Sequence, residues 1–395
     1  MSAASGQTGT RAVLRREWSR LRQDPWDAAM LSLIPLLVYG LLWWMFSAGL
    51  ARDVPIAVVD LDHSAVSRQL GRWLEAAPGL AVAEHPADEA AALESLRGGR
   101  IGGFVLVPRG LEQALRLGRS ASVHWVYDAQ SIAQAGLLGR DVRGTVATLS
   151  AGLELGGRER RGAQPVAARA QLEPLTLRLA TLFNETSNQE GFLTLTAIPS
   201  LMQIFFVLSV ITGVGRELKA GSVPQWLACA GGRWRHALAG KLAWPALAAL
   251  LQCGLFVAFF AGLRGWAVQG SGWALAAALL GLVAASFGLG LLLIGALLSL
   301  RTALSAAAFI TAPAFAFSGQ GYPLLAMPPV ARFWGDCLPL THYLQLQSRH
   351  WLEGAPAPFG VQPLLHLLGF ALVTLCLGAW LMRWRAEQPT AWGRV

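Results

Sequence analysis

The sequence contains little charge: Asp, Glu, Lys and Arg make up 14% of its 395 residues, against about 25% in an ordinary soluble domain. Hydrophobic residues make up 54%. This composition predicts an integral membrane protein rather than a soluble one. The net charge of +9 could by itself indicate a nucleic-acid-binding protein. Because the basic residues flank long apolar runs, membrane topology explains the charge, and no nucleic-acid partner is expected.

The sequence also lacks the motifs of ATP binding and of common catalytic or metal sites. No G-x-x-x-x-G-K-[ST] loop occurs, so the chain is not expected to bind ATP through a Walker motif. The seven histidines are scattered; His342 and His350 lie near Asp336 and Cys337, but without the compact spacing of metal ligands. Of the four cysteines, only Cys337 is expected outside the membrane on the external side, so no internal disulfide is predicted. We therefore expect no catalytic residue, no cofactor and no metal.

Charge is almost absent from six long, continuous apolar runs. They lie at 28–49, 193–212, 242–263, 273–300, 303–318 and 361–382. Roughly 20 apolar residues suffice for a helix to cross a bilayer, and runs without alternation favour helices over a barrel. The sequence thus predicts six transmembrane helices, the fifth short and containing Pro313. Only Glu190 and His366 lie near span ends, so proton- or sodium-coupled transport would lack its usual carriers.

The basic residues predict the orientation of these spans. Arginines precede the first run, the loop 215–241 contains arginines and two lysines, and Arg383 and Arg385 follow the last run. An even number of crossings places both termini on one side, and the positive-inside rule makes that side the cytoplasm. The long segment 50–192 is then external. We expect a multi-pass protein of the bacterial inner (cytoplasmic) membrane with both termini cytoplasmic.

Residues 1–27 are predicted to form a cytoplasmic elbow helix. Leu14, Trp18 and Leu21 recur at helical spacing, while arginines cover the remaining face. Such a helix lies in the membrane interface with its apolar stripe in the lipid. Asp24 should end it, because a residue before proline disfavours the helical conformation. The first apolar run is longer than the roughly 7–15 residues of a signal-peptide core, so we expect it to be retained as a span.

The segment 50–192 alternates strand-like and helix-like runs, which predicts an α/β extracytoplasmic domain with a sheet that is at least partly parallel. The expected strands are 55–60, 80–83, 101–107 and 122–127, and the expected helices are 63–76, 87–97, 109–117 and one from 131 to about 156. Asp60 and Asp62 form an acidic pair at the end of the first strand. Capping of the next helix by Asp62 or Ser64 is favoured over a calcium or catalytic role.

Two further stretches contain motifs. Residues 216–227 read R-E-L-K-A-G-S-V-P-Q-W-L and are followed by Gly240-Lys241. This resembles the R-E-x-x-x-G-[TS]-x-x-x-x-L … G-K stretch of type-2 ABC exporter permeases, although that family often has proline where this chain has 230–232, Ala-Gly-Gly. A second stretch is similar to the F-S-G … P … M-P … L-P-x-T pattern before the last span. Its matching residues are Phe317, Ser318, Gly319, Pro323, Met327, Pro328 and Pro339. Residues 58–64, V-V-D-L-D-H-S, resemble the subgroup with a large extracytoplasmic domain.

The resemblance implies the permease subunit of an ATP-driven ABC exporter, without an ATPase site of its own. It implies a separate ABC ATPase subunit that binds the ATP, and a second permease subunit, identical or paralogous, that forms a dimer with this one. It also implies an ATPase-coupling loop, 215–241. Its candidate residues are Arg216, Glu217, Gly221, Ser222 and Lys241. Glu217 is expected to pair with the ATPase or to brace Arg216.

The apolar spans suit a hydrophobic or amphipathic substrate, a drug or a lipid-like molecule, so multidrug efflux fits the sequence. Membrane lipid is an expected partner, and docking of a periplasmic adaptor on the external domain stays open. Two other classes are weaker. A membrane-anchored receptor or assembly factor would need fewer than six spans, and a membrane enzyme would need acidic or histidine clusters at the interface. Copurification of an ATPase would separate these classes.

Overall fold

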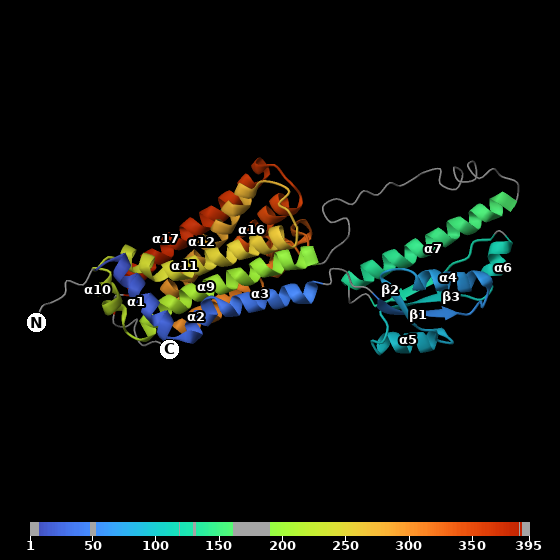
Figure 1. Ribbon diagram of the computed structural model, residues 1–395, viewed down its shortest axis with the longest axis horizontal. Helices are drawn as coiled ribbons and strands as arrows, with labels where there is room; N and C mark the ends of the chain where they lie inside the picture. Colours follow the sequence, from blue (N-terminus) through green and yellow to red (C-terminus); the bar gives the residue numbers. More distant parts are fainter. Residues whose placement is uncertain are drawn as a thin grey trace, which may run out of the picture. The chain divides into compact units, whose positions relative to one another are not determined.

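The computed structural model describes residues 8–47, 53–117, 119–128, 132–160, 190–386 and 388. The chain divides into two compact units. A membrane unit contains Met1–Ser47 and Leu182–Val395, and a soluble unit contains Ala48–Thr181. Figure 1 shows long helices in the first unit and a sheet flanked by helices in the second. Residues 48–52 and 161–189, at the ends of the predicted insertion, lie outside the described residues.

The membrane unit has five helices, among the described residues, that are long and apolar enough to cross a membrane. They are Glu190–Lys219, Trp234–Leu263, Gly272–Leu297, Leu300–Phe317 and Ala357–Arg385. A sixth crossing exists if α2 (Pro25–Leu31) and α3 (Leu33–Phe46) form one broken span. Together with α2 and α3, the α-helices of this unit are α1 (Thr10–Gln23), α9 (Leu195–Lys219), α10 (Val223–Cys229), α11 (Trp234–Val257), α12 (Gly272–Leu297), α13 (Leu300–Thr311), α14 (Ala314–Phe317), α15 (Pro329–Asp336), α16 (Pro339–Gln347) and α17 (Val361–Arg385).

The first apolar run is bent, where the sequence predicts one continuous helix over 28–49. The axes of α2 and α3 differ by 41° across Ser32. Pro35 explains the break, because it has no N–H to offer to the carbonyl of Leu31 and its ring clashes with that carbonyl. Gln252 on α11 satisfies this carbonyl instead, with Nε2 donating to Leu31 O at 3.0 Å. Asp24 caps α2, accepting hydrogen bonds from the N–H groups of residues 26 and 27.

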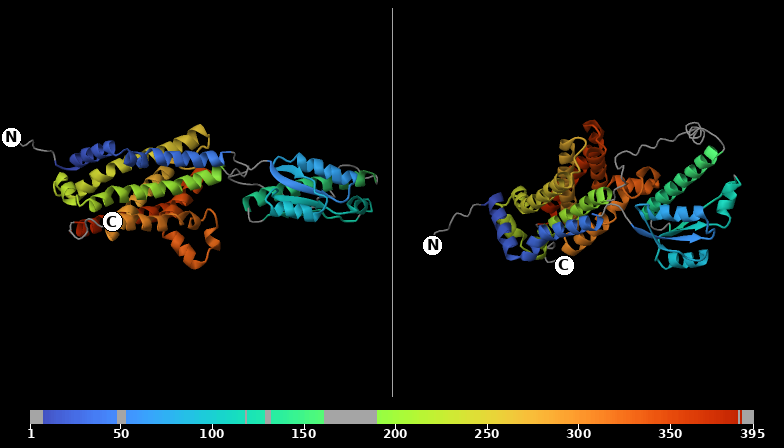
Figure 2. Two further views of the ribbon diagram at one scale, coloured as in Figure 1. Left: turned by 90° about the horizontal axis from the view of Figure 1, so that it is seen from below. Right: turned by 45° about the vertical axis from the view of Figure 1, so that its right-hand side comes forward.

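Helix α12 is the central helix of the bundle and packs against both α17 and α9. Glycines make the close approach possible. An ideal Cβ on Gly288 would lie 2.9 Å from the backbone N of Leu375 on α17, and one on Gly290 would lie 2.9 Å from Val207 O on α9. Small residues at helix contacts let backbones approach in this way. Figures 1 and 2 show α9 and α3 side by side along the same bundle.

The segment 319–360, which the predicted topology makes an external loop, contains compact helical structure. Short helical turns at Leu324–Ala326, Ser348–Leu352 and Ala357–Gly360 accompany α15 and α16. All residues of α16 are buried except Gln345, which is half-buried. Its Gln347 donates to Leu195 O at 2.5 Å, which fixes α16 to the beginning of α9. At nine residues α16 is too short to be recognised as a span by hydropathy.

The soluble unit is built on a four-stranded sheet in the order β2-β1-β3-β4. Its strands are β1 (Val54–Asp60), β2 (Leu80–Glu84), β3 (Gly103–Val107) and β4 (His124–Tyr127). β1 is parallel to β2 and β3, whereas β4 is antiparallel to β3, so the prediction of a partly parallel sheet is confirmed. The helices α4 (Ala65–Glu75), α5 (Glu89–Arg97), α6 (Leu111–Arg116) and α7 (Ile132–Arg160) lie where the sequence predicts them, within a few residues.

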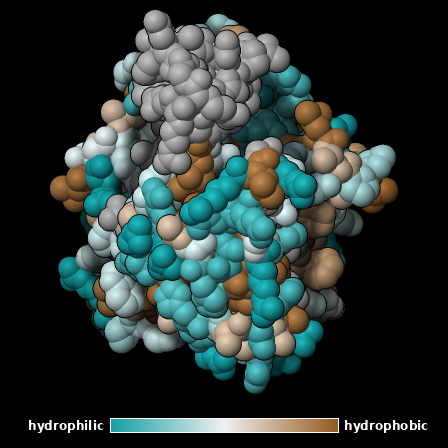
Figure 3. Space-filling model, turned by 90° about the vertical axis from the view of Figure 1, so that its right-hand side faces the viewer, coloured by the Kyte–Doolittle hydropathy of each residue, from teal (hydrophilic) through white to brown (hydrophobic). Residues whose placement is uncertain are grey.

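Alternation along β1 divides the core of this unit between two faces of the sheet. Ile56 and Val58 pack in a cluster with residues of α4 and α7, and Ala57 and Val59 pack in a cluster with residues of α5. Figure 1 shows α4 and α7 on the face opposite α5. The face of the unit seen in Figure 3 is mainly hydrophilic, as expected for a domain in water.

The acidic pair at the end of β1 organises two helix starts. Asp60 accepts hydrogen bonds from the N–H groups of Asp62 and His63 at 3.0 and 2.9 Å. Ser64 caps α4, as predicted. Asp62 caps α6 rather than α4, because its carboxylate accepts from the N–H groups of Gly110, Leu111 and Glu112, at 2.7–3.1 Å. The sequence could not show this, since α6 begins almost 50 residues later.

We expect Asp62→Ala to loosen α6 selectively. Burial alone would raise the pKa of Asp62, but hydrogen bonds from Ser64 and residues 110–112 outweigh it and hold the pKa below 3.8. Because the folded pKa is depressed, the stabilisation is present above the unfolded pKa and is lost as the pH falls through the folded pKa. Loss of such a cap costs about 0.5–2 kcal/mol, so amides of α6 should exchange roughly 2- to 30-fold faster near neutral pH.

Hydrogen exchange of the full-length protein, corrected for intrinsic rates at each pH, measures this effect. The matched control is Asp88→Ala, which removes a different cap, the one on Ala91 N of α5. It should accelerate exchange in α5 alone. Unchanged amide exchange of α6 in Asp62→Ala would contradict the assignment of Asp62 as the cap of α6. An acceleration that persists undiminished below the folded pKa of Asp62 would contradict it too.

Candidate functional site

A network of charged side chains joins α1, α9 and α11 at one end of the membrane unit. Lys241 on α11 has no exposed side-chain surface, and its Nζ lies 2.6 Å from Glu217 Oε1 on α9 and 2.7 Å from Glu17 Oε1 on α1. Arg16 Nη2 lies 2.9 Å from Glu217 Oε2. Ser222, immediately before α10, donates its hydroxyl to the same oxygen. Glu217 therefore binds groups from three other segments.

The spacing of the motif follows from this geometry. Gly221 has a φ of 64°, the left-handed conformation that allows the chain to turn sharply from α9 into α10. The turn places Ser222 beside Glu217. An ideal Cβ on Gly240 would lie 2.6 Å from Val13 Cβ, so only glycine lets α1 approach α11 beside Lys241. Four of the five residues predicted as a coupling loop, all except Arg216, thus belong to one contact.

The network is strongly electrostatic. Lys241 and Glu217 are almost fully excluded from solvent, and a buried charge is tolerated only when it is paired and hydrogen-bonded. Lys241 Nζ also lies 5.5 Å from the centre of the Trp226 ring, a cation–π contact from α10. Removal of one partner from such a buried set typically costs about 3–5 kcal/mol. The contacts therefore hold α1, α9, α10 and α11 together.

Arg216 belongs to an adjoining set rather than to the Glu217 cluster. It contacts Asp27, and its Nη1 lies 3.2 Å from Asp24 Oδ2, which ties α9 to the start of α2. Arg20 connects the two sets, at 3.3 Å from Glu17 and 3.8 Å from Asp27. Glu217 is buried and pairs with Lys241 and Arg16 rather than with Arg216, and its pairing with an ATPase stays a prediction.

Sequence reasoning missed the acidic and basic residues of α1, α2 and the position between them that complete the site. They are Arg16, Glu17, Arg20, Asp24 and Asp27. Glu17 is the one acidic residue of α1. A single carboxylate in a basic amphipathic helix was the one sequence feature from which a buried cationic partner in another helix could have been inferred.

Helix α10 presents a face that the bundle leaves open. Trp226 is fully buried, packs edge-to-face on Trp234 at 5.5 Å, and donates from Nε1 to Ala237 O at 3.3 Å. These contacts anchor α10 on α11. The opposite face and the following turn are exposed. The exposed residues are Pro224, Gln225, Ala228, Gly231, Gly232, Arg233 and Arg235.

The second motif forms a compact turn at the other end of α9. Gly319 has a φ of 87°, and Ser318 is buried with its hydroxyl donating to Phe315 O at 2.6 Å. The carbonyl of Phe317 approaches the backbone of Gly335, where an ideal Cβ would lie only 2.7 Å from that oxygen. The three prolines Pro323, Pro328 and Pro339 precede or begin helical turns, and Met327 precedes α15. The structure therefore does not bring the two predicted groups into one site.

Glu190, the ionisable residue predicted at the outer end of span two, is also paired. Its carboxylate accepts two hydrogen bonds from Arg264, at 2.9 and 2.7 Å, and one from Trp43 Nε1 at 2.9 Å. His366 stacks on His342, with ring centres 5.0 Å apart. Among the described residues, no group of three or more His, Cys, Asp or Glu side chains could hold a metal ion.

The bundle and its motifs define a multi-pass membrane protein with an inserted α/β unit. The chain belongs to the ABC-2 family transporter proteins, whose family model matches residues 28–380. The resemblance drawn from the motifs is thereby confirmed. The comparison with curated proteins finds no match. Family membership makes the chain a permease subunit of an ABC transporter, which works with an ABC ATPase.

Proposed function

We propose that the chain is the permease subunit of an exporter that moves a hydrophobic or amphipathic substrate out of the cytoplasm or the inner leaflet. A separate ATPase supplies the energy, and a second permease subunit completes the pathway. We place α1 and α10 on the cytoplasmic side of a bacterial inner membrane, because the basic residues cluster there. The observation that carries the proposal is the charged network of α1, α9 and α11, which Ser222 and Trp226 connect to α10.

In this proposal the ATPase contacts the exposed face of α10. Ser222 and Trp226 connect α10 to Glu217 and Lys241, and these two side chains connect α9 to α11 and α1. A displacement of α10 would therefore move the ends of three helices together, because a packed and ion-paired contact transmits displacement rather than absorbing it. Glu217 acts inside the permease as part of this connection rather than as a contact of the ATPase.

We expect Gln225→Trp to disrupt assembly with the ATPase. Gln225 lies on the exposed face of α10, so a bulky side chain there should leave the fold intact and obstruct docking. Copurified ATPase should fall at least tenfold, and substrate-stimulated ATP hydrolysis should fall with it. Tenfold corresponds to about 1.4 kcal/mol, a modest loss for a residue at the centre of an interface.

The matched control is Gln113→Trp, at an exposed position of α6 in the soluble unit. Both variants should accumulate in the membrane at the parental level, and Gln113→Trp should retain the ATPase. Full complex formation and activity in Gln225→Trp would rule out α10 as the docking helix.

A further inference from the structure

An apolar groove of about 480 Å³ lies between the elbow, formed by α1 and α2, and α11. Its walls include Trp18, Leu21, Leu31, Trp244, Leu247 and Leu251. Trp18 and Trp244 stack with ring centres 4.6 Å apart and close one side. Leu247 and Leu251 are 47% and 59% exposed on α11, at the level of an apolar span. We call this cavity the elbow groove.

One arginine at the elbow groove is not engaged by a carboxylate of the described part of the chain. The arginines Arg16 and Arg20 of α1 are paired with carboxylates. Arg22 lines the elbow groove, is exposed, and has no carboxylate partner among the described residues. Its guanidinium lies 4.8 Å from the centre of the Trp18 ring, and this cation–π contact holds it in place. Guanidinium groups recognise phosphate through charge-assisted hydrogen bonds.

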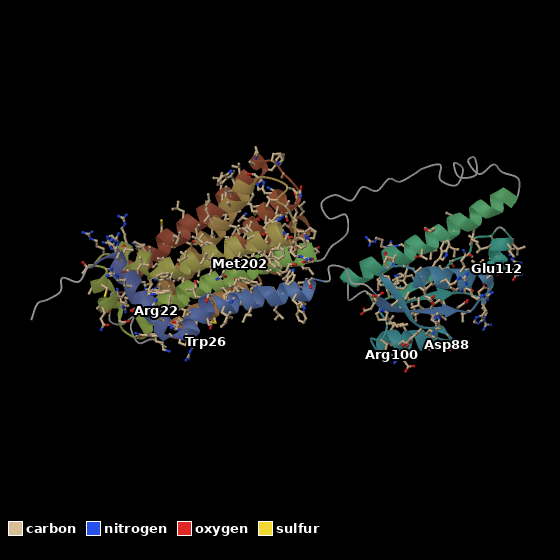
Figure 4. The ribbon with its side chains drawn as sticks, viewed as in Figure 1. Arg22, Trp26, Asp88, Arg100, Glu112 and Met202 are labelled. Carbon is tan, nitrogen blue, oxygen red and sulfur yellow. The ribbon has the colours of Figure 1, made fainter. Side chains whose placement is uncertain are left out.

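The depth of the groove in the membrane matches a phospholipid. Trp18 and Trp26 are 41% and 66% exposed, and exposed tryptophans settle at the headgroup level of a bilayer. Figure 4 shows Arg22 near Trp26, where α1 meets α2. From Trp244 to Leu251, α11 advances about 10 Å along its axis, within a helix that is long and apolar enough to cross a membrane. A phosphate at Arg22 would therefore sit at headgroup level, and an acyl chain of the same molecule would follow the groove.

We propose that the elbow groove binds one phospholipid of the adjoining leaflet, with its phosphate on Arg22 and an acyl chain along Leu247 and Leu251. The bound lipid contacts α1 and α11 together. It therefore braces the same two helices that Glu17 and Lys241 connect. This site is independent of the transported substrate and does not require the proposed direction of transport.

The test compares two lipids that differ only in the phosphate-containing headgroup. The full-length protein, freed of endogenous lipid in detergent, is titrated with phosphatidylglycerol and with diacylglycerol of the same chains, and binding is followed by native mass spectrometry. Phosphatidylglycerol should bind on the order of tenfold more tightly, as expected for a charge-assisted contact. Arg22→Gln should bring this ratio close to one, whereas Arg15→Gln, at an exposed position of α1 outside the groove, should leave it unchanged.

A second variant separates the chain site from the headgroup site. Ala248→Phe places a ring in the elbow groove and should weaken both lipids without changing their ratio. A photoreactive phosphatidylglycerol should label 18–32 and 244–251. Two outcomes would overturn the proposal by indicating annular lipid only: the same ratio of phosphatidylglycerol to diacylglycerol affinity in Arg22→Gln as in the parent, or labelling spread over all spans. A third outcome would overturn it by indicating an apolar tail site open to the transported substrate. In that case a single-chain amphiphile without phosphate would bind as tightly as phosphatidylglycerol.

Discussion

Lys241→Met should prevent the permease from accumulating as a folded protein. The substitution removes the cation between Glu17 and Glu217, each about 4% exposed, and leaves each carboxylate a single, partly exposed arginine, Arg20 and Arg16. Removal of one partner from a buried ion-paired set costs about 3–5 kcal/mol, a large part of the 5–15 kcal/mol that stabilises a typical domain. The measurement is the amount of monodisperse protein extracted from the membrane, together with its thermal midpoint in detergent.

Restoring charge balance should reverse much of this loss. In Lys241→Met combined with Glu17→Gln, Glu217 keeps Arg16 and Ser222 as partners. Replacing a whole buried pair is often neutral, in contrast to removing one member. The double variant should therefore be clearly more stable than Lys241→Met alone. The coupling energy between the two substitutions should be about 0.5–3 kcal/mol. A single variant as stable as the parent would show that the charges are not buried in the membrane-embedded protein.

The stability-rescued double variant also tests the proposed transmission. If the network carries the movement of α10 to α9 and α11, substrate-stimulated ATP hydrolysis should remain low in the double variant although folding recovers. If both recover, the network is only structural and the coupling hypothesis is wrong. Glu217→Ala is a poorer test, because Glu217 is only 4% exposed and the substitution would itself disturb the fold.

The sequence was sufficient wherever a local pattern determines structure. Continuous apolar runs predicted the five long spans, and alternation predicted each strand and helix of the soluble unit, because both patterns report the burial of a single element. The break at Ser32 had a local signal in Pro35, but the run of apolar residues around it obscured that signal. Helix α16 was missed because nine buried residues are too few to register as a span.

The partners of the charged residues could not be predicted, since they come from distant parts of the chain. Lys241 and Glu17 are separated by 224 residues, and Arg16 and Glu217 by 201. Periodicity indicates which residues are apolar, but it does not indicate which helices pack together. The motif therefore identified Glu217 and Lys241 as belonging together without revealing that the elbow helix encloses them. The motif also suggested that the carboxylate of Glu217 is available to an ATPase, whereas the surface left open by the bundle lies on α10.

Gly240→Ala should detach the elbow helix from the bundle. The added Cβ would lie 2.6 Å from Val13 Cβ and 3.0 Å from the backbone oxygen of Thr10, so α1 must move away. Overpacking of this kind costs about 1–3 kcal/mol, and any separation that breaks the contact of Glu17 with Lys241 adds to it. Trypsin cleavage at the arginines of α1 should therefore become at least tenfold faster, because a shift of about 1.4 kcal/mol already changes an opening equilibrium tenfold.

Gly254→Ala is the matched control on the same helix. Its added Cβ would meet no atom within 4 Å, so it removes a helical glycine without a clash. It should be neutral or stabilising by up to about 1 kcal/mol. Gly240→Ala combined with Val13→Gly removes the isopropyl group that the new methyl group would meet and should recover part of the protection of α1. Identical cleavage rates in Gly240→Ala and Gly254→Ala would mean that α1 does not pack on α11 in the membrane, which would remove the physical basis for the charged network and the elbow groove together.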